Sequence, residues 1–312
     1  MRIAIVRLSA MGDILHMLWC IKTIKDNYPN DTIDLFVDSR FYFLVEGLVW
    51  FDNIYGIPFK KHPFKSIKEI LKHKNNYDIS IDYQGRIKSA FITNILSKNS
   101  FGYAKCGLKE KLSYYFYKNH CECEYLENVY TRSKELTQFA LPKCKDFKLS
   151  DVLIYKDSKD IENKIANYIN TDFILLHNGS SKVSKMYPLE NFINICKNTR
   201  NKFYLSWGNE FELNRAEKIA KECENAIILP KLTFKELVFL TKHARLIIGN
   251  DSGTTHLGVV TNRPNITLLN ESSKKPAKRF VRPSDIHHYF STFDSATPDK
   301  ICKIINEVLK ND

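Results

Sequence analysis

Two series of short apolar runs, each run followed by a helical pattern, constrain the fold of this chain most. The first series begins almost at the N-terminus with residues 3–6, and the second begins with residues 173–177. Short runs rich in β-branched residues and bounded by turn residues are typical of buried strands in a parallel sheet. Because strands and helices alternate throughout both series, the chain predicts two doubly wound α/β domains.

A polar stretch at residues 142–146 separates the two series. The length of 312 residues suits two domains of ordinary size. We predict an N-terminal domain over residues 1–145, a second domain over residues 146–297 and an amphipathic C-terminal helix within residues 298–312. The expected strands are 3–6, 32–37, 52–57, 78–82, 173–177, 203–207, 226–229, 246–249 and 265–269. The expected helices are 14–27, 88–96, 125–141, 190–199, 211–223, 234–243, 254–260 and 298–309.

The composition describes a globular protein with a strong positive charge. Hydrophobic residues make up 44% of the chain and charged residues 26%, and the formal net charge is +12. Such a charge fits nucleic acid, an anionic membrane surface or a phosphorylated substrate as partner, or simply a lysine-rich proteome. No apolar run approaches the roughly 18 residues of a membrane span. The strand–turn–helix pattern at the N-terminus differs from a signal peptide, so we expect a cytoplasmic protein.

The eight cysteines are scattered, and Cys121 and Cys123 form a lone C-x-C without a second half. This spacing does not predict a zinc site, and thiols used for packing are typical of a reduced, cytosolic protein. We therefore expect neither a metal nor a cofactor.

The strongest candidate for a ligand site follows the apolar strand 246–249. The residues after that strand are small or polar: Asp251, Ser252, Gly253, Thr254, Thr255 and His256. Gly253 lets a ligand approach the backbone, and Thr254 or Thr255 can cap the next helix. Ligands of open α/β sheets bind at the carboxyl ends of strands, and helix N-termini attract anions. The pattern predicts a phosphorylated ligand, with His256 either beside it or in a structural role.

Two further loops of the second domain carry polar residues after a strand. The loop 177–185 contains one glycine, three serines and two lysines, among them Ser180, Ser181 and Lys185. Such hydroxyl, amide and ammonium groups donate hydrogen bonds to phosphate, although the Walker spacing is absent and an ordinary polar loop is the alternative. Glu212, in the first turn of a helix, either accepts hydrogen bonds from ribose hydroxyls or only complements the helix dipole.

In the first domain, Asp13 lies just past the first strand. Gly12 is the only glycine in that turn, so the G-x-G-x-x-G fingerprint is absent and a NAD or FAD role is disfavoured. Asp13 either complements the dipole of the next helix or serves as a general base. His16, one turn further on, either positions Asp13 or packs in the core.

Basic residues cluster in three regions of the chain. They include Lys60, Lys61, Lys65, Lys68, Lys72 and Lys74, then Lys105, Lys109 and Lys111, and then Lys274, Lys275, Lys278, Arg279 and Arg282. Aromatic residues at 114–117 lie near the second cluster. Such clusters fit nucleic acid or an anionic lipid surface, and a solvated charged face is the alternative for each.

Several motifs occur in a characteristic order. They are the opening segment 1–16, the D-x-Q-G-x-x-K-S-A pattern of residues 82–90, the element Lys185-Met186-Tyr187-Pro188, the pair Trp207-Gly208 followed by Arg215-Ala216, and Asp251-Ser252-Gly253 with His256-Leu257. Together they resemble the heptosyltransferases of glycosyltransferase family 9 over nearly the whole chain. Tyr187 stands where that family has tryptophan, Ser252 where it usually has threonine, and Thr254 where it usually has leucine. Residues 269–273 replace its usual Gly-Pro-Thr, which puts any ligand contact from that loop in doubt.

The resemblance implies a GT-B fold, with two Rossmann-like domains, a cleft between them and the C-terminal helix packing back on the first domain. It implies an inverting transfer of heptose from ADP-L-glycero-D-manno-heptose to Kdo of lipid A–Kdo, in the synthesis of the lipopolysaccharide or lipooligosaccharide inner core. The expected enzyme is a monomer, cytoplasmic and peripheral on the inner membrane, and it binds no nucleic acid.

The resemblance also implies roles for individual residues. Asp13 takes the place of the catalytic base. The donor-binding positions are Ser180, Ser181, Lys185, Glu212, Leu232, Asp251, Ser252, Gly253 and His256. Candidates for contact with the acidic Kdo and the lipid A phosphates are Lys60, Lys61, Lys65, Lys109 and Arg132.

Four other functions stay open at this point. The chain fits a family member that transfers heptose to an already heptosylated acceptor, or one that transfers another sugar. A sugar epimerase of the same fold needs no large basic acceptor face. A basic nucleic-acid-binding protein explains the charge but leaves the donor-site residues unexplained.

Overall fold

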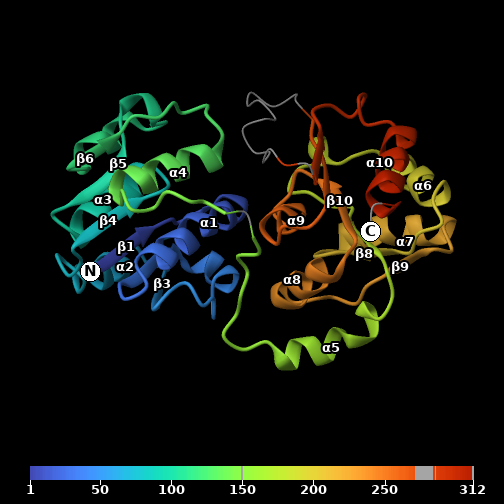
Figure 1. Ribbon diagram of the computed structural model, residues 1–312, viewed down its shortest axis with the longest axis horizontal. Helices are drawn as coiled ribbons and strands as arrows, with labels where there is room; N and C mark the ends of the chain where they lie inside the picture. Colours follow the sequence, from blue (N-terminus) through green and yellow to red (C-terminus); the bar gives the residue numbers. More distant parts are fainter. Residues whose placement is uncertain (149, 271–283, 285, 311–312) are drawn as a thin grey trace. The chain divides into compact units, whose positions relative to one another are not determined.

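The computed structural model describes residues 1–148, 150–270, 284 and 286–310. It divides into two compact units, Met1–Lys156 and Asp157–Asp312. Each unit is built on one parallel sheet flanked by helices, as the alternating sequence pattern predicts (Figure 1). Among the described residues, no helix has both the length and the apolar composition to cross a bilayer.

The first unit contains a six-stranded sheet in the order β3-β2-β1-β4-β5-β6. Its strands are β1 (Arg2–Val6), β2 (Thr32–Asp38), β3 (Asn53–Ile57), β4 (Ile79–Asp82), β5 (Ser100–Tyr103) and β6 (Asn119–Cys121). Its helices are α1 (Met11–Asn27), α2 (Pro63–Leu71), α3 (Ile87–Leu96) and α4 (Val129–Ala140), with short 3-10 turns η1 (Ser39–Leu44), η2 (Lys105–Gly107) and η3 (Lys111–Phe116). The strand order reverses between β1 and β4, which is where doubly wound sheets bind ligands.

The second unit repeats this topology with the strand order β12-β11-β10-β7-β8-β9. Its strands are β7 (Ile174–His177), β8 (Phe203–Ser206), β9 (Ala226–Ile228), β10 (Leu246–Asn250), β11 (Asn265–Leu268) and β12 (His287–Phe290). Its helices are α5 (Lys159–Ile169), α6 (Leu189–Lys197), α7 (Glu210–Glu222), α8 (Phe234–His243), α9 (Thr255–Val260) and α10 (Pro298–Lys310), with the 3-10 turn η4 (Val183–Lys185). The strand order reverses between β7 and β10, so a ligand site of the second unit is expected at the carboxyl ends of these two strands.

The division between the units follows Lys156, whereas the predicted domain boundary follows residue 145. Two tryptophans of the first unit explain the difference. The Trp19 indole donates to the Ser150 carbonyl at 2.9 Å, and the Trp50 indole donates to the Val152 carbonyl at 2.6 Å. These hydrogen bonds, together with the buried side chains of Val152 and Leu153, attach the segment after residue 145 to the first unit.

Helix α10 contributes to the core of the second unit. Its buried residues Ile301, Cys302 and Ile305 pack there, and α10 contacts α6. The packing of this helix against the first domain, which the resemblance implies, stays a prediction.

The sequence patterns missed several helices and strands. They are α2, α5, β5, β6 and β12. The edge strand β6 reads Asn-His-Cys and carries no apolar pattern, whereas α2 carries apolar residues at helical spacing but buries only Ser66 and Ile70.

Candidate functional site

The carboxyl ends of β7 and β10 bring two predicted loops together. The strands pair in parallel, with His177 opposite Gly249, so the loop after β7 and the residues after β10 emerge side by side. There the Lys185 ammonium bonds to the Asp251 carboxylate, and His256 Nε2 lies 3.4 Å from the other carboxylate oxygen. Residues far apart in the sequence therefore form one cluster at the point where the strand order reverses.

The Asp251 carboxylate is the negatively charged centre of this cluster. Burial opposes the charged form of its carboxyl group, but hydrogen bonds and charges from His256 and Lys185 outweigh that effect. The pKa of Asp251 is therefore held well below its usual range, and the carboxylate stays ionised at neutral pH. Ser180 joins the cluster, because its hydroxyl donates to the Asp251 carbonyl at 3.3 Å.

Asn250, the last residue of β10, fixes the loop after β7. Its side chain is fully buried. The amide nitrogen donates to the Gly179 carbonyl at 3.1 Å, and the amide oxygen accepts from the Tyr187 amide at 2.7 Å. Both ends of the loop that carries Ser180 and Lys185 are thus fastened to the neighbouring strand. The sequence reasoning missed Asn250, although a polar residue closing an apolar strand is a signal that could have found it.

Glu212 lies against the same loop from the start of α7. Asn209 caps this helix by accepting from the Glu212 amide at 3.0 Å, and the Glu212 carboxylate accepts from the Gly208 amide at 2.8 Å. A Cβ atom on Gly179 would lie 2.1 Å from a Glu212 carboxylate oxygen. The absence of a side chain at Gly179 therefore allows the carboxylate to reach the loop.

The turn before α9 differs in one detail from the expectation. Thr254 has helical backbone angles and makes no capping hydrogen bond through its side chain. Instead Ser252 Oγ accepts from the Thr255 amide at 3.4 Å and lies 2.9 Å from the Thr254 hydroxyl. Thr254 therefore occupies the N-cap position, as expected, but the side-chain hydrogen bond to the helix comes from Ser252, which is within reach of the free amide.

The remaining donor candidates lie around this cluster. Gly253 is partly exposed in the turn after β10, and Ser181 is exposed in the loop after β7. Leu232 is partly buried in the segment between β9 and α8, so it follows the carboxyl end of another strand of the same sheet.

In the first unit, Asp13 lies in the first turn of α1 and pairs with Arg7. A guanidinium nitrogen of Arg7 lies 2.8 Å from the carboxylate, whose side chain is 31% exposed. Burial opposes ionisation of this carboxyl group, but the charges of Arg7 and His16 and the Ala10 amide outweigh it and lower the pKa of Asp13. Asp13 is therefore an ionised and accessible carboxylate, while His16 is buried beside it.

The D-x-Q-G motif holds the loop that leads to Asp13. Gln84 follows β4, and its side-chain oxygen accepts from the Leu8 amide at 2.8 Å and from the Ser9 amide at 3.1 Å. Asp82 in turn accepts from the Gln84 amide at 2.7 Å and from the Tyr117 hydroxyl at 2.6 Å. Neither Gln84 nor Arg7 was among the predicted site residues, although Gln84 belongs to a quoted motif.

Four of the five predicted acceptor residues are exposed cations. They are Lys60, Lys61, Lys65 and Lys109. The fifth prediction is wrong: Arg132 is only 6% exposed and is committed to the interior of the first unit. Its guanidinium donates to the Glu124 carbonyl at 2.6 Å and to the Gly107 carbonyl at 2.9 Å, and it stacks over the Tyr103 ring at 4.2 Å. Arg132 therefore holds loops in place and presents no charge to a ligand.

Some expectations fall outside the described residues. They concern Lys274, Lys275, Lys278, Arg279 and Arg282, and the residues 271–273. Within the described part of the chain, no group of three or more His, Cys, Asp and Glu side chains is arranged to hold a metal ion.

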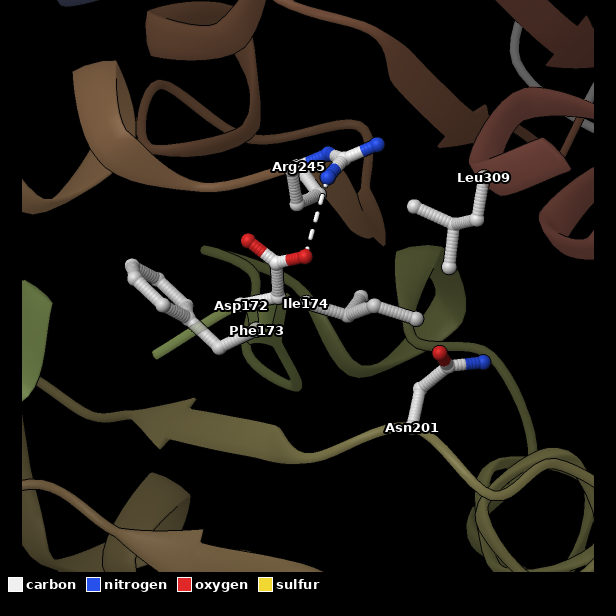
Figure 2. Close-up of a pocket in the computed structure, with 6 residues that line it drawn as sticks. All are labelled: Asp172, Phe173, Ile174, Asn201, Arg245 and Leu309. Atoms are coloured by element: carbon white, nitrogen blue, oxygen red, sulfur yellow. Dashed lines mark hydrogen bonds and ion pairs between the residues drawn. The ribbon is translucent and has the colours of Figure 1, made fainter. Parts of the chain in front are cut away.

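A pocket in the second unit lies near the amino ends of β7 and β10, at the opposite end of these strands from the cluster around Asp251. Figure 2 shows its lining, in which Arg245 and Asp172 form an ion pair of 2.9 Å. Asp172 precedes β7 and Arg245 precedes β10, whereas the cluster around Asp251 follows the carboxyl ends of these strands. The pocket therefore does not belong to the candidate site.

Comparison with known proteins places this chain among glycosyltransferases. The sequence model of the family described as "Glycosyltransferase family 9 (heptosyltransferase)" matches residues 65–286. The chain is 35% identical to lipopolysaccharide heptosyltransferase 1 of Campylobacter coli, over 96% of this chain and 92% of that protein. It is similar to the solved structure of E. coli heptosyltransferase WaaC with ADP-2-deoxy-2-fluoro heptose (TM-score 0.79, 20% identity, 98% and 99% of the two chains). It is also similar to the family 9 glycosyltransferase of Veillonella parvula (TM-score 0.80, 15% identity, 100% and 97% of the two chains).

Proposed function

The chain belongs to glycosyltransferase family 9 (heptosyltransferase) and is a glycosyltransferase, and from this premise we propose that it transfers heptose from ADP-L-glycero-D-manno-heptose to Kdo of lipid A–Kdo. The observation that carries the proposal is the cluster of Lys185, Asp251, His256 and Ser180 at the carboxyl ends of β7 and β10. The name of the Campylobacter coli relative and the heptose analogue bound to the E. coli enzyme support the choice of sugar.

The donor nucleotide is proposed to bind to the second unit. Lys185 supplies a positive charge to the pyrophosphate, with the hydroxyls of Ser180 and Ser181 as further donors. These groups stabilise the negative charge that develops on the departing ADP. Glu212, fixed beside the same loop, accepts hydrogen bonds from the ribose. The other positions proposed around the adenine, the pyrophosphate and the sugar are Leu232, Ser252, Gly253, Asp251 and His256.

The acceptor is proposed to react at Asp13. The ionised carboxylate removes a proton from a Kdo hydroxyl, whose oxygen forms a bond to the anomeric carbon of the heptose. The bond from that carbon to the ADP phosphate oxygen breaks in the same step, so the configuration inverts. Lys60, Lys61, Lys65 and Lys109 provide exposed cations for the carboxylates and phosphates of the acceptor. We also propose that the enzyme is a cytoplasmic monomer, peripheral on the inner membrane.

The test is to incubate the protein with ADP-heptose and either Kdo–lipid A or its heptosylated form, and to weigh the products. One added heptose on Kdo–lipid A supports the proposal. A product formed only from the heptosylated acceptor would instead identify a heptosyltransferase II. No product with either acceptor, despite binding of ADP, would point to another sugar of the family.

The contact between Gly179 and Glu212 makes a prediction about donor binding. The methyl group of Gly179→Ala would overlap the Glu212 carboxylate and displace it from the ribose position. Loss of a hydrogen bond to a charged group costs about 1.5–3 kcal/mol, so the Kd for ADP should rise about 10- to 100-fold in calorimetry. Gly208→Ala is the matched control, because its Cβ would lie 3.4 Å from the same carboxylate and should leave the Kd unchanged. Equal affinities of the two variants would contradict the assignment of Glu212.

The pairing of Arg7 with Asp13 makes a prediction about pH. A base must be ionised to act, and the positive charge of Arg7 lowers the pKa of Asp13. In Arg7→Gln that stabilisation is lost, so the pKa of Asp13 rises and the acidic limb of the kcat/KM profile moves to higher pH. Arg7→Lys, which keeps the charge, should keep the limb near its original position. An unchanged limb in Arg7→Gln would show that the acidic limb does not report Asp13.

A further inference from the structure

Helix α2 of the first unit presents an apolar stripe to solvent. Phe64 is 86% exposed and Leu71 48% exposed, and Ile67 between them is also exposed. At 3.6 residues per turn, the three side chains fall within a strip about 60° wide on the helix surface. The buried side of the helix carries Ser66 and Ile70 instead. The apolar stripe is therefore additional to the face with which α2 packs on its own unit.

Lysines occupy the neighbouring strip of the same helix. Lys65, Lys68 and Lys72 repeat the spacing of the apolar stripe and are all exposed. Lys60 and Lys61 immediately precede the helix and are exposed as well. An apolar stripe bordered by cations is the pattern of a helix that lies in the plane of an anionic bilayer surface, with its apolar side chains among the acyl chains and its cations at the headgroups.

Helix α3 contacts both α2 and η3, and both α3 and η3 carry exposed apolar side chains. Ile87 and Phe91 of α3 are exposed one turn apart, and Leu112 and Tyr115 of η3 are 64% and 69% exposed. The Phe91 ring packs edge-on against Phe116 of η3, with 6.1 Å between centroids. The seven exposed apolar side chains of α2, α3 and η3 form what we call the α2–α3–η3 face: Phe64, Ile67, Leu71, Ile87, Phe91, Leu112 and Tyr115.

Cations also accompany the rest of this face. Lys88 is exposed on α3, and its ammonium lies 4.9 Å from the centre of the Phe59 ring. Lys105 lies 5.1 Å from the ring centre of Tyr115. Grouped exposed apolar side chains mark an interaction surface, and the surrounding positive charge selects an anionic partner.

We propose that the α2–α3–η3 face docks on an anionic lipid bilayer, with its apolar side chains inserted at the headgroup boundary. The proposal deepens the proposed function and rests on it in one respect, namely that a lipid-linked acceptor is reached from a membrane surface. Docking brings Lys60, Lys61 and Lys65, proposed to bind the acceptor, to the level of the headgroups.

The test uses the full chain and the double variant Phe64→Ser with Leu71→Ser, in flotation with acceptor-free vesicles. The wild-type protein should float with vesicles of phosphatidylglycerol and phosphatidylethanolamine, should stay unbound with phosphatidylcholine alone, and should lose binding as salt is raised. The variant should lose roughly tenfold or more of its partitioning, because two large apolar side chains no longer leave water on docking.

The matched control is Leu126→Ser with Phe139→Ser, which removes the same two residue types at exposed positions outside the face. This control should float like the wild-type protein. No flotation of the wild-type protein, equal flotation of the two double variants, or a dimer that only the α2 variant disrupts would each overturn the proposal.

Heptose transfer to detergent-dispersed Kdo–lipid A is measured separately and should be equal in all three proteins. A chain that floats without transferring heptose contradicts the proposed function alone, and one that transfers without floating contradicts the docking alone.

Discussion

Asp13→Ala should abolish heptose transfer while leaving the affinity for ADP unchanged. The structure gives Asp13 an ionised carboxylate, a cationic neighbour in Arg7 and an accessible surface, which are the properties that a base needs. General-base catalysis contributes about 10²- to 10⁴-fold in rate, so kcat should fall by at least that factor. The rate is followed by the mass of the product, and ADP binding by calorimetry.

Asp26→Ala is the control for this substitution. Asp26 belongs to the same helix and pairs with Lys22 at 2.5 Å on its exposed side. Because exposed ion pairs contribute little to stability, this variant should fold and transfer heptose normally. Transfer by Asp13→Ala at a rate close to that of the wild-type protein would refute the base assignment.

Lys185→Met should impair both donor binding and transfer. The lysine is the cation of the cluster around Asp251, and its loop is fastened to β10 through Asn250. A charged hydrogen-bond donor contributes about 1.5–3 kcal/mol, so the Kd for ADP should rise about 10- to 100-fold. Removing a donor that faces the leaving group should lower kcat by a further factor of about 10² to 10³.

Lys182→Met provides the comparison within the same loop. Lys182 is exposed, three residues before Lys185, so its removal changes the net charge of the loop by the same amount. If Lys185 contacts the donor specifically, Lys185→Met loses affinity for ADP and Lys182→Met does not. Similar losses in both would attribute the effect to charge alone and would remove Lys185 from the proposed site.

Much of the fold and part of the site follow from the sequence. Buried strands carry a local apolar pattern, and the ends of strands next to the reversal of strand order must lie together. The contact between Lys185 and Asp251 could therefore be predicted once the order of the strands was known. By contrast, the sequence does not distinguish an arginine that binds a ligand phosphate from one that donates hydrogen bonds to backbone carbonyl groups. Arg132 could not be recognised as internal before Glu124 and Gly107 were seen to accept its hydrogen bonds.

Details of helix capping and of the segment between the two units could not be predicted for a related reason. Whether a serine or a threonine caps a helix depends on backbone angles at single residues, which Ser252 and Thr254 do not reveal by their identities. The polar stretch 142–146 has the composition of a linker, but the indole groups of Trp19 and Trp50 hold the residues that follow it to the first unit. Long-range hydrogen bonds of this kind leave no local pattern.

The two carboxamides beside the reversal points have a common consequence. Gln84, after the fourth strand of the first unit, holds the loop after its first strand, and Asn250, at the end of the fourth strand of the second unit, does the same there. A carboxamide carries no charge at any pH at which a protein is folded, and its hydrogen bonds are therefore insensitive to acidity. The two carboxamide anchors therefore persist across the pH range in which Asp13 titrates, and acidity reaches the first loop through carboxyl groups such as Asp82, which holds the Gln84 amide. A pH–rate profile of this enzyme would then report the titration of carboxyl groups such as Asp13 and Asp82, with no contribution from the carboxamides that hold the loops.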